Sequence, residues 1–202
     1  MRNVGRSIVL AAALAGSVCS QALASDNDIF ALFRQPEPQQ ANVADPSLTR
    51  EQPAATRMVV ADPTDQRAGS ITIDTRHRYL YLSLGGGEAL RYAVGVGRAG
   101  FEWSGRAQIG RKAEWPTWTP PQEMLKRRPD LPRFMEGGID NPLGARAMYL
   151  YSGKRDTMYR IHGSNEPDTI GQAVSSGCIR MLNEDVTDLY NRVRVGTAVT
   201  VL

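Results

Sequence analysis

Cys178 and His162 are the two residues of this chain whose types could support covalent catalysis. The 202 residues contain two cysteines and two histidines in all. A cysteine attacks a carbonyl as its thiolate, and a free thiol is mostly protonated at neutral pH, so the nucleophile needs a neighbouring base or a positive charge. His162 ends an expected strand and is a better candidate for that base than His77, which lies in a polar strand start. Residue types alone leave open that Cys178 is buried and inert and that His162 is structural.

The segment around the cysteine reads Ser175-Ser-Gly-Cys-Ile-Arg180. Gly177 lets the backbone approach a substrate closely, and the N–H groups near Cys178 are expected to form an oxyanion hole. In an extended segment Arg180 shares a face with Cys178, because alternate residues of a strand point the same way. The segment therefore predicts that Arg180 binds a substrate carboxylate through paired hydrogen bonds.

Composition excludes several other classes of protein. Two cysteines and two histidines are too few for a zinc framework or a dense disulfide scaffold, so we expect no metal and no cofactor. Hydrophobic residues make up 42% and charged residues 22% of the chain, which is ordinary globular usage. The formal net charge of +3 falls to +1 if the first 24 residues are removed, because 22 basic and 21 acidic residues remain, and this balance argues against a nucleic-acid partner.

Residues 1–24 have the three parts of a secretory signal peptide. Two arginines precede an apolar run over residues 7–16, and small residues end the segment at Ala24. The run is shorter than the roughly 20 residues that span a bilayer. We therefore expect cleavage after Ala24, export, and no membrane span afterwards, with a retained anchor as the alternative.

This cleavage changes the meaning of the cysteine count. Cys19 lies inside the signal, and Val18 before it disfavours lipidation, because lipoprotein signals usually need a small residue there. Cys178 then remains as a single thiol in an exported protein. Oxidising compartments usually pair or eliminate cysteines, so such a thiol is either buried and inert or kept for its reactivity.

Two segments divide the rest of the chain. Residues 25–68 are rich in Gln, Pro, Ala and Asp and predict a flexible linker, because they cannot bury enough apolar area to offset the entropy of ordering. Residues 69–202 predict a single, mainly β domain of the sandwich or barrel type, since short β-prone runs follow one another at near-regular spacing. The expected strands are 71–74, 79–84, 89–96, 106–115, 147–151, 158–162 and 198–202, with a glycine turn at 85–87.

Two stretches of this domain break the strand pattern. Residues 116–142 hold six of the twelve prolines around a short helical stretch at 122–128, and a long insertion of this kind is often a lid over a binding site. A C-terminal helix is expected from Asn183 as its N-cap, with Glu184 and Asp185 at its positive end. Its apolar residues recur at helical spacing, so we expect it to pack on the sheet near the thiol.

A His-Gly pair at 162–163 precedes the Ser-Ser-Gly-Cys sequence at 175–178, and twelve residues separate His162 from Ser175. This arrangement resembles the signature of the L,D-transpeptidase catalytic domain, also called the YkuD domain, in which a histidine is followed a dozen or more residues later by Ser/Thr-His-Gly-Cys. The short spacing is similar to that of the periplasmic enzymes of Gram-negative bacteria. The likeness covers residues 69–202.

The resemblance implies an activity, a location and roles for individual residues. Cys178 would attack a peptidoglycan stem tetrapeptide before its terminal D-Ala, releasing D-Ala and leaving a thioester, and His162 would be the general base. Gly163 would orient the imidazole through its carbonyl oxygen. An amine acceptor in the periplasm would then resolve the thioester: a neighbouring stem peptide, a lipoprotein or an outer-membrane protein. The positions that would flank the substrate are Ser175, Ser176, Gly177 and Arg180.

One position departs from the family pattern, because Ser176 stands where the motif has its second histidine. The departure bears on rate and acceptor preference, since the expected base is His162. Three alternatives remain: an L,D-carboxypeptidase in which water resolves the thioester, a catalytically silent wall-binding module, and a sortase-like enzyme. Sortases place their histidine much further from the cysteine and usually carry a membrane anchor, which favours the transpeptidase.

Overall fold

The computed structural model describes residues 55–202, which form a mainly β domain as the sequence predicts. The expected signal peptide at 1–24 and the expected linker before residue 55 lie outside the described residues. Neither helix in the described part of the chain has the length and apolar character that crossing a membrane requires.

Eleven strands and two α-helices make up residues 55–202. The strands are β1 (Met58–Ala61), β2 (Ile71–Asp74), β3 (Tyr79–Gly85), β4 (Glu88–Ala93), β5 (Val96–Gly97), β6 (Gly105–Glu114), β7 (Arg146–Ser152), β8 (Arg155–His162), β9 (Ala173–Ser175), β10 (Ile179–Arg180) and β11 (Ala198–Val201). The helices are α1 (Gln122–Arg127) and α2 (Asn183–Arg192), and a 3₁₀ helix covers Pro167–Thr169.

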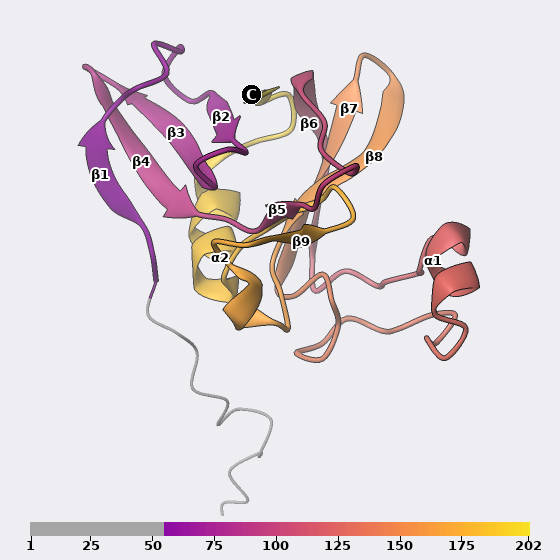
Figure 1. The fold of residues 1–202 in the computed structure, drawn as a ribbon. Helices are drawn as coiled ribbons and strands as arrows, with labels where there is room; N and C mark the ends of the chain where they lie inside the picture. Colours follow the sequence, from indigo (N-terminus) through magenta and orange to yellow (C-terminus); the bar gives the residue numbers. More distant parts are fainter. Residues whose placement is uncertain (1–54) are drawn as a thin grey trace, which may run out of the picture. The chain divides into compact units, whose positions relative to one another are not determined.

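Nine of the strands form one mixed sheet in the order β1-β4-β3-β2-β11-β6-β7-β8-β10, and β5 pairs with β9 in a small second sheet (Figure 1). Two pairs in the large sheet are parallel, β2 with β11 and β8 with β10. Each parallel pair joins strands that are not consecutive along the chain. The pair of β8 and β10 contains the predicted site residues His162 and Arg180.

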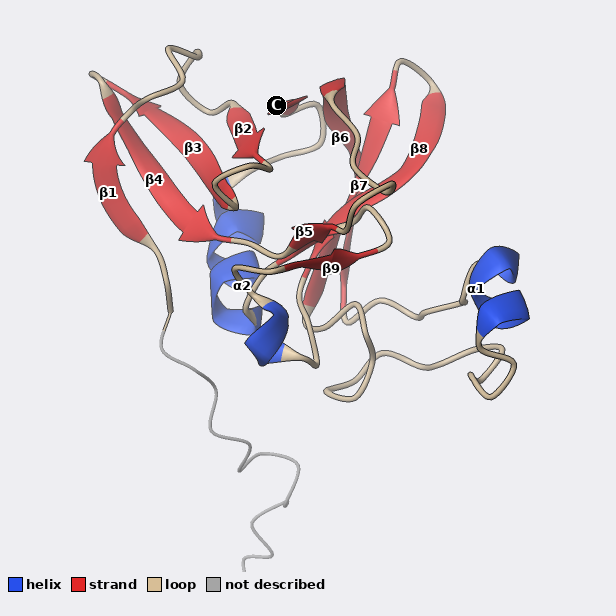
Figure 2. Ribbon diagram, in the orientation of Figure 1, coloured by secondary structure: helices blue, strands red, loops and turns tan. Residues whose placement is uncertain are grey.

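The strands form where apolar residues alternate with polar ones, so that one face of the sheet is buried. Ile71 and Ile73 of β2 and Leu80 of β3 are fully buried in the core. Figure 2 shows α2 between the strands β1–β4 and the strands β6–β8. Its Val186 and Leu189 are also fully buried, so the amphipathic helix closes the same core.

The start of α2 corrects one prediction. The helix begins at Asn183, and its N-cap is Leu182, with no side-chain capping bond. Asn183 instead joins two loops: its Oδ1 accepts a hydrogen bond from the N–H of Ala145 at 2.9 Å, and its Nδ2 donates to the carbonyl of Ser164 at 3.2 Å. The amide therefore secures the loop that follows His162, and these distant partners explain why it does not cap the helix.

The folded domain begins earlier than the sequence predicts. β1 lies within the expected linker, yet it pairs antiparallel with β4. Just before β1, the N–H and the hydroxyl of Thr56 donate to Oδ2 of Asp185 at 2.9 and 2.8 Å. Asp185 is fully buried. A buried carboxylate needs such donors, so Asp185 anchors the incoming chain, where the sequence predicted only a helix-end charge.

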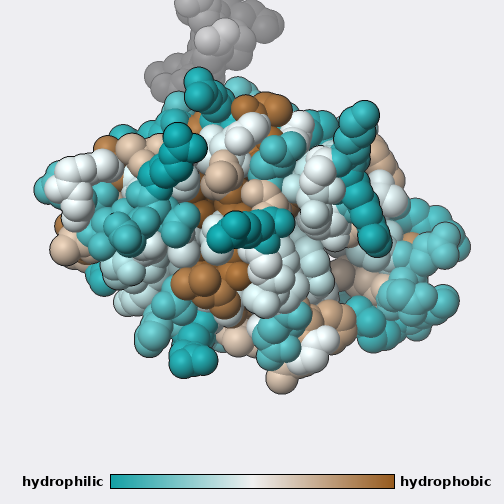
Figure 3. Space-filling view, turned by 90° about the horizontal axis from the view of Figure 1, so that it is seen from above, coloured by the Kyte–Doolittle hydropathy of each residue, from teal (hydrophilic) through white to brown (hydrophobic). Residues whose placement is uncertain are grey.

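The proline-rich segment 116–142 carries α1, which buries none of its residues. Figure 3 shows largely hydrophilic side chains at the end of the domain where α1 lies. The segment is closed at its base, where Trp118 and Met135 exchange two backbone hydrogen bonds of 2.8 Å. Asn141 is buried there and donates to the carbonyls of Pro116 and Glu136 at 3.0 and 2.8 Å.

Candidate active site

Parallel pairing of β8 with β10 brings the predicted site residues together. Ile161 pairs with Ile179, and His162 pairs with Arg180. Both isoleucines are buried in the core. Because alternate residues of a strand face opposite sides, His162, Arg180 and the preceding Cys178 belong to the outward face. Cys178 thus lies diagonally from His162 across the two strands, a separation that side chains can bridge.

Burial and one hydrogen bond define the state of His162. The residue is 4% exposed, and its Nδ1 lies 2.5 Å from the carbonyl oxygen of Gly163. A carbonyl oxygen can only accept, so Nδ1 carries the proton and Nε2 is the basic atom. Burial is the largest influence on the pKa of His162 and lowers it to about 4, although the hydrogen bond to Gly163 acts to raise it. His162 is therefore a neutral imidazole at neutral pH.

Cys178 is a neutral thiol under the same conditions. Burial raises the pKa of the thiol, while a hydrogen bond from the Arg160 backbone and the charges of Arg160 and Arg180 act in the opposite direction. A neutral thiol beside a neutral imidazole favours general-base catalysis, in which the proton leaves the sulfur as the new bond forms. Burial of both groups disfavours a preformed thiolate and imidazolium pair.

Ser175 closes the turn that leads to the thiol. Its hydroxyl donates to the carbonyl of Cys178 at 2.6 Å and accepts from the N–H of Gly177 at 3.1 Å. The residue is buried, so both bonds are protected from water. The structure thus gives Ser175 a positioning role, whereas Ser176, at the position of the family's second histidine, is exposed.

Gly177 is required by its backbone angle and by its surroundings. Its φ is +107°, and an added Cβ would lie 2.5 Å from Cε1 of Tyr159 and 3.1 Å from the carbonyl oxygen of Phe101. The ring of Tyr159 stacks on Trp103 with centroids 4.5 Å apart. Tyr159 and Phe101 are neighbours of the site that sequence reasoning missed. The only signal for Tyr159 was its place on the strand that ends at His162.

Arg180, the predicted carboxylate ligand, already binds a carboxylate of this chain. Its Nη1 donates to Oε2 of Glu166 at 2.7 Å and to the hydroxyl of Thr169 at 3.3 Å. The side chain of Glu166 is 58% exposed and that of Arg180 is 22% exposed. A pair with one exposed partner contributes little stability, so a substrate carboxylate can replace Glu166 at small cost.

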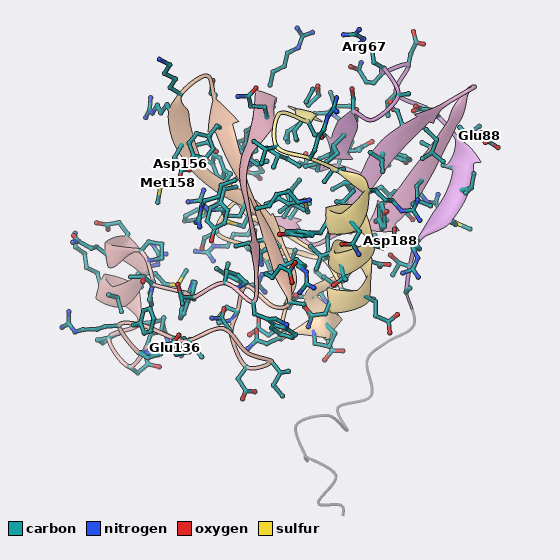
Figure 4. The ribbon with its side chains drawn as sticks, turned by 180° about the vertical axis from the view of Figure 1, so that it is seen from behind. Arg67, Glu88, Glu136, Asp156, Met158 and Asp188 are labelled. Atoms are coloured by element: carbon teal, nitrogen blue, oxygen red, sulfur yellow. The ribbon has the colours of Figure 1, made fainter. Side chains whose placement is uncertain are left out.

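A second arginine stands beside the thiol and is also paired. Arg160 binds both carboxylate oxygens of Asp156, at 2.8 and 3.0 Å. Figure 4 shows Asp156 and Met158 at the outer end of β8. Within residues 55–202, no group of three or more His, Cys, Asp and Glu side chains is arranged to hold a metal ion.

Residues 68–201 match the family model of the L,D-transpeptidase catalytic domain, YkuD. Among curated proteins, the chain is 36% identical over 148 residues to a probable L,D-transpeptidase ErfK/SrfK of Escherichia coli, covering 69% of this chain and 46% of that protein. It is 32% identical over 145 residues to a probable L,D-transpeptidase YbiS of the same species, covering 68% of this chain and 45% of that protein. The chain thus spans about half the length of these relatives.

Two solved structures show a similar fold. A protein of Brucella melitensis, described as a probable carnitine operon oxidoreductase, is 47% identical with a TM-score of 0.51, covering 75% of this chain and 96% of its own. An L,D-transpeptidase from Mycobacterium smegmatis is 17% identical with a TM-score of 0.50, covering 65% of this chain and 57% of its own. At that identity the second likeness concerns the fold alone.

The buried imidazole predicts a pH-dependent stability. The folded pKa of His162 is depressed to about 4 from the ordinary 6.5, so below the unfolded value the unfolded state binds more protons and folding is disfavoured. Between pH 7 and pH 5 the free energy of unfolding should fall by about 2 kcal/mol through this group. Urea unfolding should show this loss in the wild type and in a Cys178→Ala control. A His162→Gln variant should lack most of it, and an unchanged loss in that variant would contradict the assignment.

Gly177 and Gly171 form a matched pair for testing the close approach beside the thiol. Both have positive φ, +107° and +81°, but an added Cβ at Gly171 meets no atom within 4 Å. Gly171→Ala should cost about 1–2 kcal/mol through backbone strain alone. Gly177→Ala should cost about 1–3 kcal/mol more, because the ring of Tyr159 must move. The measurement is the free energy of unfolding of each variant, and equal costs would show that the contact is unimportant.

Proposed function

The chain belongs to the L,D-transpeptidase catalytic domain family, and we propose on that premise that it is an L,D-transpeptidase acting through Cys178 and His162. Its donor is a peptidoglycan stem tetrapeptide, and its acceptor is an amine. One observation carries the proposal: the register of β8 and β10 puts the thiol and the imidazole on one face, and Gly163 directs the basic Nε2 away from the backbone. Nucleophile, base and orienting group are then supplied by Cys178, His162 and Gly163.

In the first step, Nε2 of His162 accepts the thiol proton while Sγ of Cys178 bonds to the carbonyl carbon before the terminal D-Ala. The carbonyl electron pair moves to the oxygen and gives a tetrahedral oxyanion. When this collapses, the C=O bond re-forms and the C–N bond breaks. The imidazolium returns its proton to the departing amine, so free D-Ala leaves and a thioester remains.

The N–H of Cys178 is the proposed donor to the oxyanion. The N–H of Gly177 already donates to Ser175, which commits it to the turn. The N–H of Cys178 has no acceptor within the described residues 55–202. A donor held in place before the reaction stabilises charge that develops only in the transition state. Ser175 thus supports catalysis by fixing the turn that presents this N–H.

In the second step, an acceptor amine attacks the thioester. His162 accepts the amine proton, the C–S bond breaks, and the proton passes to the departing sulfur, which restores the thiol. A stem-peptide amine would give a 3-3 crosslink, whereas a protein amine would attach a lipoprotein or an outer-membrane protein to the wall. Water in the same role would give carboxypeptidase activity, and the base and nucleophile would be unchanged.

The location and the lid belong to the same proposal. A signal peptide at residues 1–24 would deliver the enzyme to the periplasm, where peptidoglycan is accessible. The segment 116–142 would act as a lid over the donor, since α1 places the guanidinium of Arg127 5.8 Å from the ring centroid of Phe101. Phe101 adjoins Gly177, so a movement of α1 would reach the turn that carries the thiol.

The acyl-enzyme tests the proposed nucleophile and base. Incubation with a stem tetrapeptide should add the mass of the acyl group to the wild-type chain, with loss of D-Ala, and the adduct should map to Cys178. His162→Ala should form no adduct, because Nε2 is the only proposed proton acceptor. The matched control is His77→Ala, which removes the exposed histidine and should acylate as the wild type does.

Alkylation with iodoacetamide establishes in parallel that the thiol of each variant is folded and reactive. A His162→Ala enzyme that still acylates at an appreciable rate would rule out the assigned base. No adduct on a reactive wild-type thiol with any stem peptide would rule out the proposed function. Adding an amine acceptor and analysing the products separates transfer from hydrolysis.

Arg180 should affect donor binding more than chemistry. Arg180→Lys keeps the charge but loses the fork that binds a carboxylate through two hydrogen bonds, so KM for the donor should rise about tenfold with kcat nearly unchanged. Arg192→Lys is the matched control, since Arg192 forms the same kind of pair with Asp188 on α2. Steady-state release of D-Ala measures both constants. A fall in kcat without a change in KM would instead place Arg180 in the reacting geometry.

A further inference from the structure

A cavity of about 480 Å³ lies on the outward face of β2, β3 and β11. This volume is typical of a small-molecule site, for which roughly 300–1,000 Å³ is usual. None of its lining residues belongs to the candidate active site, and β6 and β7 separate β11 from β8 in the sheet. The cavity is therefore separate from the candidate active site around Cys178.

Two rows of cross-strand neighbours form the floor of this cavity. In the first row, Thr72 of β2 lies between Tyr81 of β3 and Thr200 of β11. In the second row, Asp74 of β2 pairs with Tyr79 of β3. The residues that alternate with them face the core, so the floor is rigid and its side chains point outward.

The carboxylate in the floor is held in place by the turn that follows β2. The backbone N–H of His77 donates to Oδ1 of Asp74 at 2.9 Å, and Nδ1 of His77 lies 2.7 Å from Oδ2. Burial raises the pKa of Asp74, but the hydrogen bonds from His77 outweigh it and keep the pKa below its ordinary value. An ionised, oriented acceptor therefore faces the cavity at neutral pH.

Thr72 supplies an independent indication of a ligand. The residue is 2% exposed, and its Oγ1 has no hydrogen-bond partner among residues 55–202. A buried polar atom left without a partner costs about 1–3 kcal/mol, so such atoms are rare and usually have a functional reason. Thr72 stands in the middle of the cavity floor, and its Oγ1 is covered in this structure, so a ligand hydroxyl or amide supplies the missing bond once the neighbouring side chains move apart.

The lining favours a neutral polyhydroxyl ligand. Its polar groups are three threonine hydroxyls, two tyrosine hydroxyls, one glutamine amide and the pair of Asp74 and His77, and no lysine or arginine lines the cavity. The lining itself therefore offers an anion no lysine or arginine partner, and the nearby Arg91 is already stacked on Tyr79. The ring of Tyr79 is fixed by the guanidinium of Arg91 at 4.4 Å from its centroid and meets Tyr81 edge-on at 6.3 Å. Such rings offer flat apolar surface beside groups that donate and accept hydrogen bonds.

We propose that this cavity binds an oligosaccharide of N-acetylated amino sugars. The C–H faces of the sugar rings pack on the two tyrosines, and the hydroxyl and acetamido groups bond to Asp74 and Thr72. The occupant is the glycan of the same polymer whose stem peptides acylate Cys178, and in this respect the inference rests on the proposed function. Figure 4 shows Arg67, next to the rim residue Gln66, at the opposite end of the domain from Glu136 in the segment 116–142. The enzyme would thus hold the glycan at one end while stem peptides react at another.

Binding of chitotetraose, a peptide-free oligomer of N-acetylglucosamine, tests this proposal on the protein as it exists. Titration calorimetry and amide chemical shifts should show binding to the wild type, with the largest shifts in β2, β3 and β11. Thr72→Val, Asp74→Asn and Tyr81→Ala should each weaken the affinity about tenfold or more, the loss expected for a buried hydrogen bond or a stacked ring. Cys178→Ala should bind as the wild type does.

Thr72→Val also has a readout that does not depend on the ligand. It removes an unpaired buried hydroxyl while keeping the side-chain shape, so the variant should be at least as stable as the wild type while binding chitotetraose more weakly. If Tyr81→Ala fails to fold, Thr72→Val and Asp74→Asn still decide the question. Absent binding, or equal affinity in the wild type and the folded variants, would overturn the proposal. Its failure is distinct from that of the proposed function, which the acyl adduct on Cys178 measures separately.

Discussion

The site depends on the parallel register of β8 and β10, which consists of two residue pairs. Burial of Ile161 and Ile179 fixes this register, since each fully buried side chain contributes about 1.5–3 kcal/mol. A slip of β10 by one residue would turn Ile179 outward and carry Cys178 toward the core, away from the face of His162. The hydrophobic pairing therefore sets the chemistry, because the thiol and the imidazole are aligned only when the core is packed.

Burial also sets the protonation state of the thiol and the imidazole, and it requires hydrogen-bond partners for buried polar side chains nearby. The imidazole and the thiol are both held neutral by loss of solvent, which suits a base that takes a proton during attack. Two polar side chains at the start of α2 have distant partners: the half-buried Asn183 joins the loops at 145 and 164, and the buried Asp185 anchors Thr56. The hydrogen bonds to Asp185 prevent an unpaired buried carboxylate, and an unpaired buried polar group would cost about 1–3 kcal/mol. These hydrogen bonds hold the loop that follows His162 and the start of α2 in place.

Sequence reasoning succeeded where the signal is local. β2 coincides with the predicted 71–74, and β11 differs from the prediction by one residue, because strand propensity and alternation agree there. β5, β9 and β10 have only two or three residues, too few for any alternation to be visible. The motif singled out Cys178 and His162, which lie at neighbouring strands, but the turn closed by Ser175 and the contact with Tyr159 arise from tertiary packing. The roles of Asn183 and Asp185 were mistaken for the same reason, since their partners lie far away in the chain.

The alternation that builds the core also decides where function can reside. Apolar residues occupy the inward face of the sheet, so polar side chains gather on the outward face, and the strand order determines which of them become neighbours. At the β8 and β10 edge this face carries the thiol and the imidazole, and across β3, β2 and β11 it carries Asp74, Thr72 and their neighbours. A fully buried hydroxyl without a partner on such a face is unfavourable for folding alone. The two proposals together describe one function, in which the outward face holds a polymer by its glycan and reacts with its peptides.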